Sequence, residues 1–117
     1  MSNDTSFLTK TKEERKSISD HLSNNYPNMI PIHISRKFNY EKKIEKNKFL
    51  TPRNMTLNNF ILIIRQKIII DQYKSLCICH KDKLLNINDT LGFLFDNYKN
   101  KTDNILYLFY ITETSFG

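Results

Sequence analysis

A run of seven apolar and aromatic residues, Ile105 to Ile111, constrains the fold of this chain more than any other feature. An uninterrupted apolar run of this length is typical of a strand that is buried on both faces in the middle of a sheet. Because the run lies close to the end of the sequence, the strands beside it must come from earlier segments. The run therefore predicts a sheet whose last strand is central.

The earlier segments carry the patterns of two strands and a long helix. Alternating isoleucines predict a half-buried strand over 29–34, and a second strand begins near Lys48. Thr56 is placed to cap a helix over 57–69, where apolar residues recur at helical spacing. Shorter patterns predict a helix over 11–25, strands over 76–79 and 84–87, and a helix over 91–98.

The elements follow the order helix, strand, strand, helix, strand, strand, short helix, strand. This order predicts an α+β class fold of the β-grasp type, in which the long helix covers one face of the sheet. The 117 residues fit one globular unit, because a second core would not have room. We expect a helical extension over 1–25 and a β-grasp domain over 26–117.

The formal net charge of +6 favours acidic partners, such as phosphates, anionic lipid headgroups or peptides that carry Asp and Glu. The charge alone does not choose among these classes. We expect no nucleic-acid partner, because no single strand interleaves aromatic and basic residues in the way that nucleic-acid binders do.

Two cysteines, Cys77 and Cys79, alternate on one face of a predicted strand and have no further ligands at zinc-site spacing. They are expected to be buried structural thiols in a reducing compartment. The N-terminal segment lacks the apolar core of a signal peptide, and no apolar run of about 20 residues occurs. We therefore expect a cytoplasmic protein that acquires any membrane attachment.

No arrangement of residues in the sequence is typical of catalysis. The histidines, His21, His33 and His80, lie in different elements, and no Ser or Cys nucleophile stands in a recognisable motif beside them. A glycine-rich phosphate loop is also missing. The chain is expected to be a substrate of enzymes rather than an enzyme, with no cofactor and no metal.

Several short motifs follow one another along the chain: Tyr26-Pro27-Asn28-Met29-Ile30-Pro31-Ile32, Lys48-Phe49-Leu50-Thr51-Pro52, Met55-Thr56-Leu57 leading through Phe60 to Ile64-Arg65-Gln66-Lys67-Ile68, and the ending Phe116-Gly117. In this order and at this spacing, the chain from about Arg15 to Gly117 resembles the GABARAP-like family of ubiquitin-like autophagy modifiers.

The resemblance implies a ubiquitin-like β-grasp domain preceded by two extra N-terminal helices. It also implies that Gly117, at the end of a tail that includes Phe116, is conjugated to phosphatidylethanolamine on autophagosomal membranes. Activating and conjugating enzymes would join the two, and a deconjugating cysteine protease would separate them. The protein would be cytoplasmic before lipidation and on the autophagosome membrane after it.

The resemblance further implies a groove for autophagy receptors that carry short aromatic-x-x-aliphatic motifs, which add to the edge of the second strand. The first pocket of this groove would be formed by Leu22, Pro31, Lys48, Leu50 and Ile105. The second pocket would be formed by Phe49, Pro52, Met55, Phe60 and Ile63. Acidic residues that flank the motif would meet Lys46, Lys48, Arg65 and Lys67.

Two alternatives stay open from the sequence. The chain is either an adaptor that binds peptides without ever being conjugated, or a modifier that is joined to a protein lysine instead of a lipid. The segment from Tyr26 to Pro31 and the Phe116-Gly117 ending favour the lipid.

Overall fold

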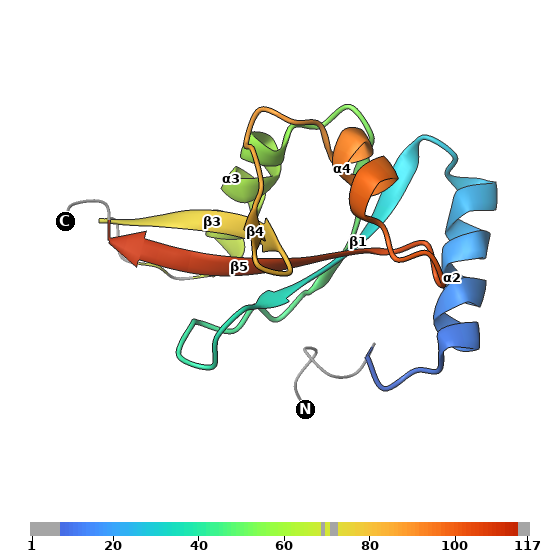
Figure 1. The fold of residues 1–117 in the computed structure, drawn as a ribbon, viewed down its shortest axis with the longest axis horizontal. Helices are drawn as coiled ribbons and strands as arrows, with labels where there is room; N and C mark the ends of the chain where they lie inside the picture. The colour runs from blue at the N-terminus through green and yellow to red at the C-terminus, as the bar shows by residue number, and fades with distance from the viewer. Residues whose placement is uncertain (1–7, 69, 71–72, 115–117) are drawn as a thin grey trace.

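The structure, a computed structural model, describes residues 8–68, 70 and 73–114. Its five strands form one sheet in the order β2-β1-β5-β3-β4. The strands are β1 (Met29–Arg36), β2 (Lys48–Pro52), β3 (Lys74–His80), β4 (Lys83–Leu84) and β5 (Leu106–Thr114). The helices are α2 (Lys12–Asn25), α3 (Leu57–Lys67) and α4 (Leu91–Tyr98). In Figure 1, α3 and α4 cover one face of the sheet and α2 crosses its end, so the predicted β-grasp arrangement is confirmed.

The central position predicted for the last strand is confirmed, because β5 pairs in parallel with β1 and antiparallel with β3. Leu106, Leu108 and Tyr110 are completely buried beneath α3 and α4. The prediction of burial on both faces is wrong, since Tyr107 and Phe109 on the other face are only half-buried. Figure 1 shows α2 at one end of the sheet only, so this helix does not cover β5 along its length.

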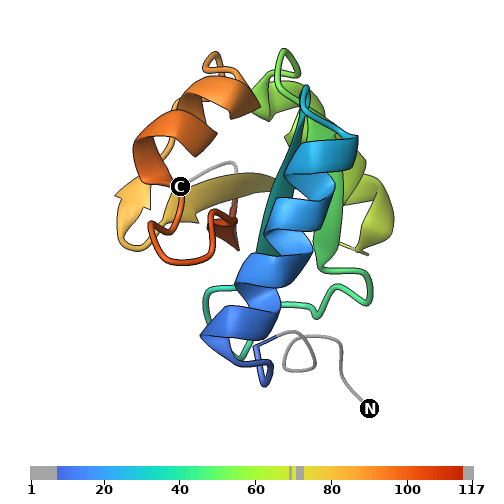
Figure 2. The same cartoon turned by 90° about the vertical axis from the view of Figure 1, so that its right-hand side faces the viewer.

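Strand β1 is more buried than predicted, whereas β5 is less buried than predicted. Ile30, Ile32 and Ile34 enter the core, as their alternation indicated. Pro31 and His33 on the other face are also buried, although a half-buried strand was expected. Because α2 packs against β1 (Figure 2), both faces of this strand are covered.

Helix α3 forms as its sequence predicts at the beginning and stops early at the end. The Thr56 side chain accepts a hydrogen bond from the Asn59 backbone nitrogen at 3.2 Å, which satisfies one of the unpaired donors of the first turn. Residues at helical spacing face the core: Leu57, Phe60, Ile61 and Ile64. The helix ends at Lys67, and Ile68 already has extended backbone angles, so the predicted end at residue 69 is wrong.

Helix α2 docks on the sheet through polar contacts. Its N-terminus has a capping box formed by Thr11 and Glu14. Ile18 is exposed, whereas Ser19 is completely buried and donates a hydrogen bond to the Asn104 carbonyl oxygen at 3.2 Å. This helix is one of the two N-terminal helices expected, and the other would precede it, where residues 1–7 lie outside the described residues.

The second strand pair is smaller than predicted, and its two cysteines differ. Strand β4 contains only two residues, which replaces the predicted strand over 84–87. Cys79 is buried as expected, but Cys77 is half-buried. Burial, and then the nearby Glu113 carboxylate, raise the pKa of the Cys77 thiol, so it stays protonated near neutral pH.

Gly92, the glycine of this sequence other than Gly117, provides a test of helix packing. Gly92 in α4 is buried, and a Cβ atom there would lie 2.9 Å from the Arg53 carbonyl oxygen, which already accepts the Gly92 N–H. Alanine favours helix by about 1 kcal/mol over glycine, but overpacking typically costs about 1–3 kcal/mol. We expect Gly92→Ala to lower the free energy of unfolding in urea, whereas the exposed neighbour Phe93→Ala changes it by no more than about 0.5 kcal/mol. An unchanged or higher stability of Gly92→Ala would contradict this packing.

Candidate functional site

A groove of about 300 Å³ lies where α2 crosses β1 and β2. It brings together all the residues predicted for the first pocket: Leu22, Pro31, Lys48, Leu50 and Ile105. These residues come from a helix, two strands and the segment before β5, so only the fold makes them neighbours. The groove also includes Phe49, which was predicted for the second pocket, and Lys46, which was predicted as a contact for acidic flanking residues. Three further lining residues were not in the predicted set: Ile18, Ile32 and His33.

The shape of the groove follows from the sheet register. Pro31 and Leu50 stand opposite each other in the antiparallel pair of β1 and β2, so their side chains share one face. Ile18 and Leu22, one turn apart on α2, supply the apolar side of the groove that belongs to the helix. Strand β2 is at the edge of the sheet, which is the geometry that an added peptide strand requires.

The charge beside the groove comes from lysines. Lys46 and Lys48 are exposed, and the Lys46 ammonium lies 5.3 Å from the centre of the Phe49 ring. His33 is buried within the groove lining, and burial, followed by the charges of Lys48 and Arg15, lowers its pKa to about 4. The imidazole is therefore neutral at pH 7, and the groove favours acidic over basic ligand groups.

The residues predicted for the second pocket line up along β2 and α3. Phe49 packs edge-to-face on Phe60, with ring centres 5.5 Å apart, and Phe60 is completely buried. Pro52, Met55 and Ile63 are half-buried, and Met55 packs against the core cluster that contains Phe60. Phe60 thus supports the surface from the core, and a bound peptide does not reach it unless neighbouring side chains move.

The predicted contacts for acidic flanking residues are divided between two places. Lys46 and Lys48 line the groove, whereas Arg65 and Lys67 lie in the last turn of α3 and do not line it. The Arg65 guanidinium donates a hydrogen bond to the Lys74 carbonyl oxygen at 3.0 Å, which ties α3 to β3. Arg65 therefore has a structural role that the sequence pattern did not indicate.

The predicted conjugation tail, Phe116 and Gly117, lies outside the described residues, which end at Thr114. Among the helices that are described, none has the length and apolar composition needed to span a bilayer. Within the same residues, no three His, Cys, Asp or Glu side chains gather as a metal site would require.

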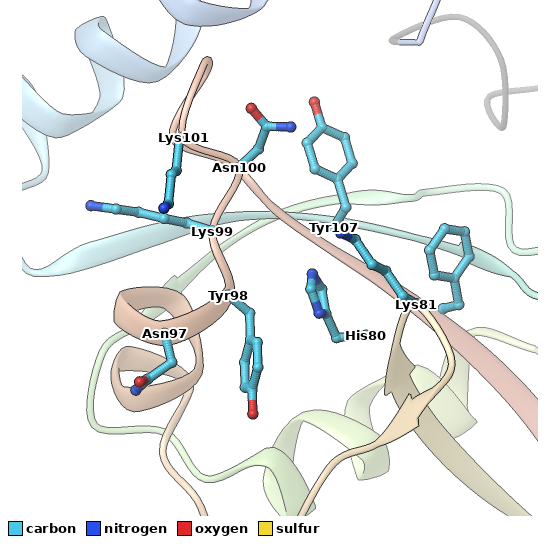
Figure 3. A pocket seen from close by; sticks show the side chains of 9 residues that line it. His80, Lys81, Asn97, Tyr98, Lys99, Asn100, Lys101 and Tyr107 are labelled. Carbon is cyan, nitrogen blue, oxygen red and sulfur yellow. The ribbon is translucent and has the colours of Figure 1, made fainter.

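A second cavity, of about 540 Å³, was not anticipated from the sequence (Figure 3). Its walls come from the end of β3, the end of α4, the loop after α4 and the start of β5. The rings of His80 and Tyr98 lie 4.9 Å apart, and Lys83 donates a hydrogen bond to the Tyr98 hydroxyl at 2.7 Å. The Lys99-Asn100-Lys101 segment was the sequence signal that could have drawn attention to this place.

The second cavity is basic. Lys81, Lys99 and Lys101 line it, and none of them forms an ion pair with a carboxylate in the part of the chain that the structure describes. Burial, together with the charges of Lys81 and Lys83, lowers the pKa of His80. The cavity consequently has a positive potential that favours anionic groups.

Comparisons with known proteins agree on one family. Residues 14–117 match the family model described as "Autophagy protein Atg8 ubiquitin like". The chain is 33% identical over 109 residues to Autophagy-related protein 8D of rice, Oryza sativa subsp. japonica, with 92% of each chain covered. It is 28% identical over 106 residues to Autophagy-related protein 8 of Candida glabrata, with 90% of this chain and 89% of the relative covered. The crystal structure of Trypanosoma brucei ATG8 superposes with a TM-score of 0.84 at 24% identity, covering 94% of this chain and 95% of that one.

The buried histidine predicts a pH dependence of stability. Folding lowers the pKa of His33 from 6.5 to about 4, so above pH 6.5 the imidazole is neutral in both the folded and the unfolded chain. As the pH falls from 6.5 to 4, only the unfolded chain binds the proton, and the free energy of unfolding falls by up to about 3 kcal/mol. We expect urea unfolding to show that this free energy falls more steeply with pH for the parent than for His33→Gln over this range. If the free energy of unfolding fell equally in the two proteins, the pKa of His33 would not be lowered by folding.

Proposed function

The chain belongs to the Atg8 family of ubiquitin-like autophagy proteins, and from this we propose that it is a membrane-conjugated modifier that captures receptor peptides. Gly117 is joined to phosphatidylethanolamine on autophagosomal membranes. The groove between α2 and β2 then binds receptors that carry an aromatic-x-x-aliphatic motif.

One observation carries the peptide-binding part of this proposal. The five residues predicted for the first pocket line one groove, and that groove adjoins the edge strand β2. An extended peptide that pairs with β2 directs alternate side chains toward the same face as Leu50, because side chains alternate along a strand. Its backbone hydrogen bonds supply affinity for any sequence, and the pocket supplies the choice of side chain.

The composition of the groove favours a particular kind of side chain. Ile18, Leu22, Pro31 and Leu50 offer apolar contact to a large ring or an aliphatic group. Lys46 and Lys48 at the same groove attract Asp or Glu beside the motif, although their exposure makes this attraction weak and dependent on salt. Apolar contact therefore provides most of the affinity, and the lysines add selectivity.

Glycine at the end of the tail suits the chemistry of conjugation. The Gly117 carboxylate first attacks ATP and is adenylated with release of pyrophosphate. An enzyme thiol then displaces AMP to form a thioester, and the lipid amine displaces the thiol to form an amide. A residue without Cβ allows the acyl carbon to enter narrow enzyme channels. The two acyl chains of the lipid hold the protein on a bilayer much more firmly than one chain would.

The two alternatives make different demands on Gly117. An adaptor that is never conjugated would keep a free Gly117 carboxylate on membranes and in the cytoplasm. A modifier of proteins would carry an isopeptide bond to lysine. Mass spectrometry of the C-terminal peptide from membrane-bound protein in its native cell distinguishes a free carboxylate, a lipid amide and an isopeptide.

We predict that Gly117→Ala abolishes membrane association in cell fractionation, because the added methyl group obstructs acyl transfer. Binding of a motif peptide in the groove should be unchanged in the same variant. If Gly117→Ala remained as membrane-bound as the parent, conjugation through this residue would be excluded.

Leu50 tests the groove independently of conjugation. Leu50→Ala removes apolar contact worth roughly 1.5–3 kcal/mol, so it should weaken binding of an aromatic-x-x-aliphatic peptide by about ten- to a hundredfold. Calorimetric titration measures the change, and membrane association should persist. Leu62→Ala is the matched control, because Leu62 is an exposed leucine on α3 that does not line the groove. Equal affinities for the Leu50→Ala and Leu62→Ala proteins would remove the groove from the proposed function.

A further inference from the structure

The connection between β1 and β2 displays two aromatic rings to solvent at its tip. The rings of Phe38 and Tyr40 are stacked, with centres 5.3 Å apart and planes 6° from parallel. Phe38 is 42% exposed and Tyr40 is 80% exposed. Large aromatic side chains contribute most when they are buried, so an exposed pair indicates a surface that meets another phase or partner. We call residues 37–43 the aromatic loop.

The aromatic loop is held in shape by its own backbone. The Glu41 N–H donates to the Phe38 carbonyl oxygen at 3.1 Å, which closes a turn beneath the two rings. The Arg36 guanidinium donates to the Asn39 carbonyl oxygen at 3.0 Å and to the Glu41 carbonyl oxygen at 3.3 Å. The exposure of the rings is thus a property of an ordered turn.

A second set of bonds fastens the aromatic loop to the last part of β5. The buried Glu41 carboxylate accepts hydrogen bonds from the Thr112 backbone nitrogen at 3.1 Å and from the Thr112 hydroxyl at 2.7 Å. The Lys37 N–H donates to the Tyr110 carbonyl oxygen at 3.0 Å, and the Tyr110 hydroxyl donates to the Lys42 carbonyl oxygen. In Figure 1 the connection between β1 and β2 lies below the C-terminal half of β5, as these hydrogen bonds require.

This attachment fixes where the loop lies relative to the proposed conjugation site. Gly117 is the third residue after Thr114, and three residues of chain reach at most about 10 Å. A lipid on Gly117 therefore draws the bilayer surface close to the end of β5, and with it close to the aromatic loop. This step depends on the proposed conjugation.

The outward charge of the aromatic loop is basic. Lys42 and Lys43 are exposed, whereas the only acidic group of the loop, Glu41, is buried against Thr112. The Lys37 ammonium lies 5.8 Å from the Phe38 ring centre and also pairs with Asp82 at 2.9 Å. Aromatic rings beside lysines suit the interface of a membrane that contains anionic lipid, where rings enter the headgroup layer and ammonium groups meet phosphates.

We propose that the aromatic loop is a membrane-contact element, which inserts Phe38 and Tyr40 into the headgroup layer of an anionic bilayer once the C-terminus is anchored there. One short connection then adds a second point of contact to the lipid anchor. Because the lipid anchor and the aromatic loop are linked, weak insertion of the loop is enough to restrict the orientation of the protein relative to the bilayer.

The chain contains no tryptophan, so a single substitution creates a selective fluorescent probe. Phe38→Trp places the probe on the aromatic loop, and Phe93→Trp is the matched control on an exposed position of α4. A hexahistidine tail after Gly117 anchors each protein to vesicles of phosphatidylcholine, phosphatidylethanolamine, phosphatidylserine and a nickel-chelating lipid. We expect the indole emission of the Phe38→Trp protein to shift to shorter wavelength and to be quenched by brominated lipid. The emission of the Phe93→Trp protein should stay as it is in solution.

A second measurement uses the same hexahistidine-tailed protein on the same vesicles. The double variant Phe38→Ser, Tyr40→Ser should bind these vesicles at least about tenfold more weakly than the tailed parent in co-sedimentation, with an unchanged circular dichroism spectrum. Unchanged emission of the Phe38→Trp protein on the vesicles, or equal affinity of the double variant, would overturn the proposal. An emission shift of the Phe38→Trp protein that grows with protein concentration in the absence of lipid would overturn it in favour of self-association.

Failure of this inference and failure of the proposed function give different results. The nickel tether bypasses the conjugating enzymes, so an unchanged emission of the tethered Phe38→Trp protein refutes membrane contact and says nothing against Gly117. Conversely, persistent membrane association of Gly117→Ala in cells refutes conjugation, whatever the probe on the aromatic loop reports.

Discussion

The parallel pairing of β1 with β5 is the contact on which the other parts of this structure depend. It aligns Ile32 with Leu106 and Arg36 with Tyr110, which places the last strand of the chain beside the first. Parallel neighbours cannot be joined by a tight turn, so the chain between β1 and β5, which also contributes β2, β3 and β4 to the sheet, must cross from one side of this pair to the other. That crossover supplies α3 and α4, whose apolar residues bury one face, and it leaves β2 at the edge.

The opposite face of the sheet carries α2, which is held there by polar contacts, and the groove lies beside this helix. Helix α2 is tied to the segment before β5 by the Ser19 hydrogen bond to Asn104 and by the approach of Arg15 to Asp103 at 3.7 Å. Because polar contacts fix the helix, its apolar residues Ile18 and Leu22 do not have to be buried in the core. They remain available on the groove lining, where a ligand can use them.

The two proposed activities lie at opposite ends of the same strand. Ile105, just before β5, lines the groove, whereas Thr112 near the other end holds the aromatic loop. Nine residues of strand span about 30 Å, so a peptide in the groove and a membrane at the tail do not compete for space. Figure 1 shows the same separation, with α2 at one end of the sheet and the end of β5 at the other.

Local patterns in the sequence were sufficient to identify the elements, their order and the central position of β5, because periodicity and capping depend on neighbouring residues. The residues of the first pocket were predicted only through family resemblance, since no local pattern links Leu22 to Ile105. The tertiary structure alone decided that Ser19 is buried, that Arg65 binds the Lys74 carbonyl, and that the loop carrying Phe38 is fastened to Thr112. Burial and hydrogen bonding at these positions depend on partners up to 85 residues away in the sequence. The residues next to each side chain in the sequence do not predict such distant partners.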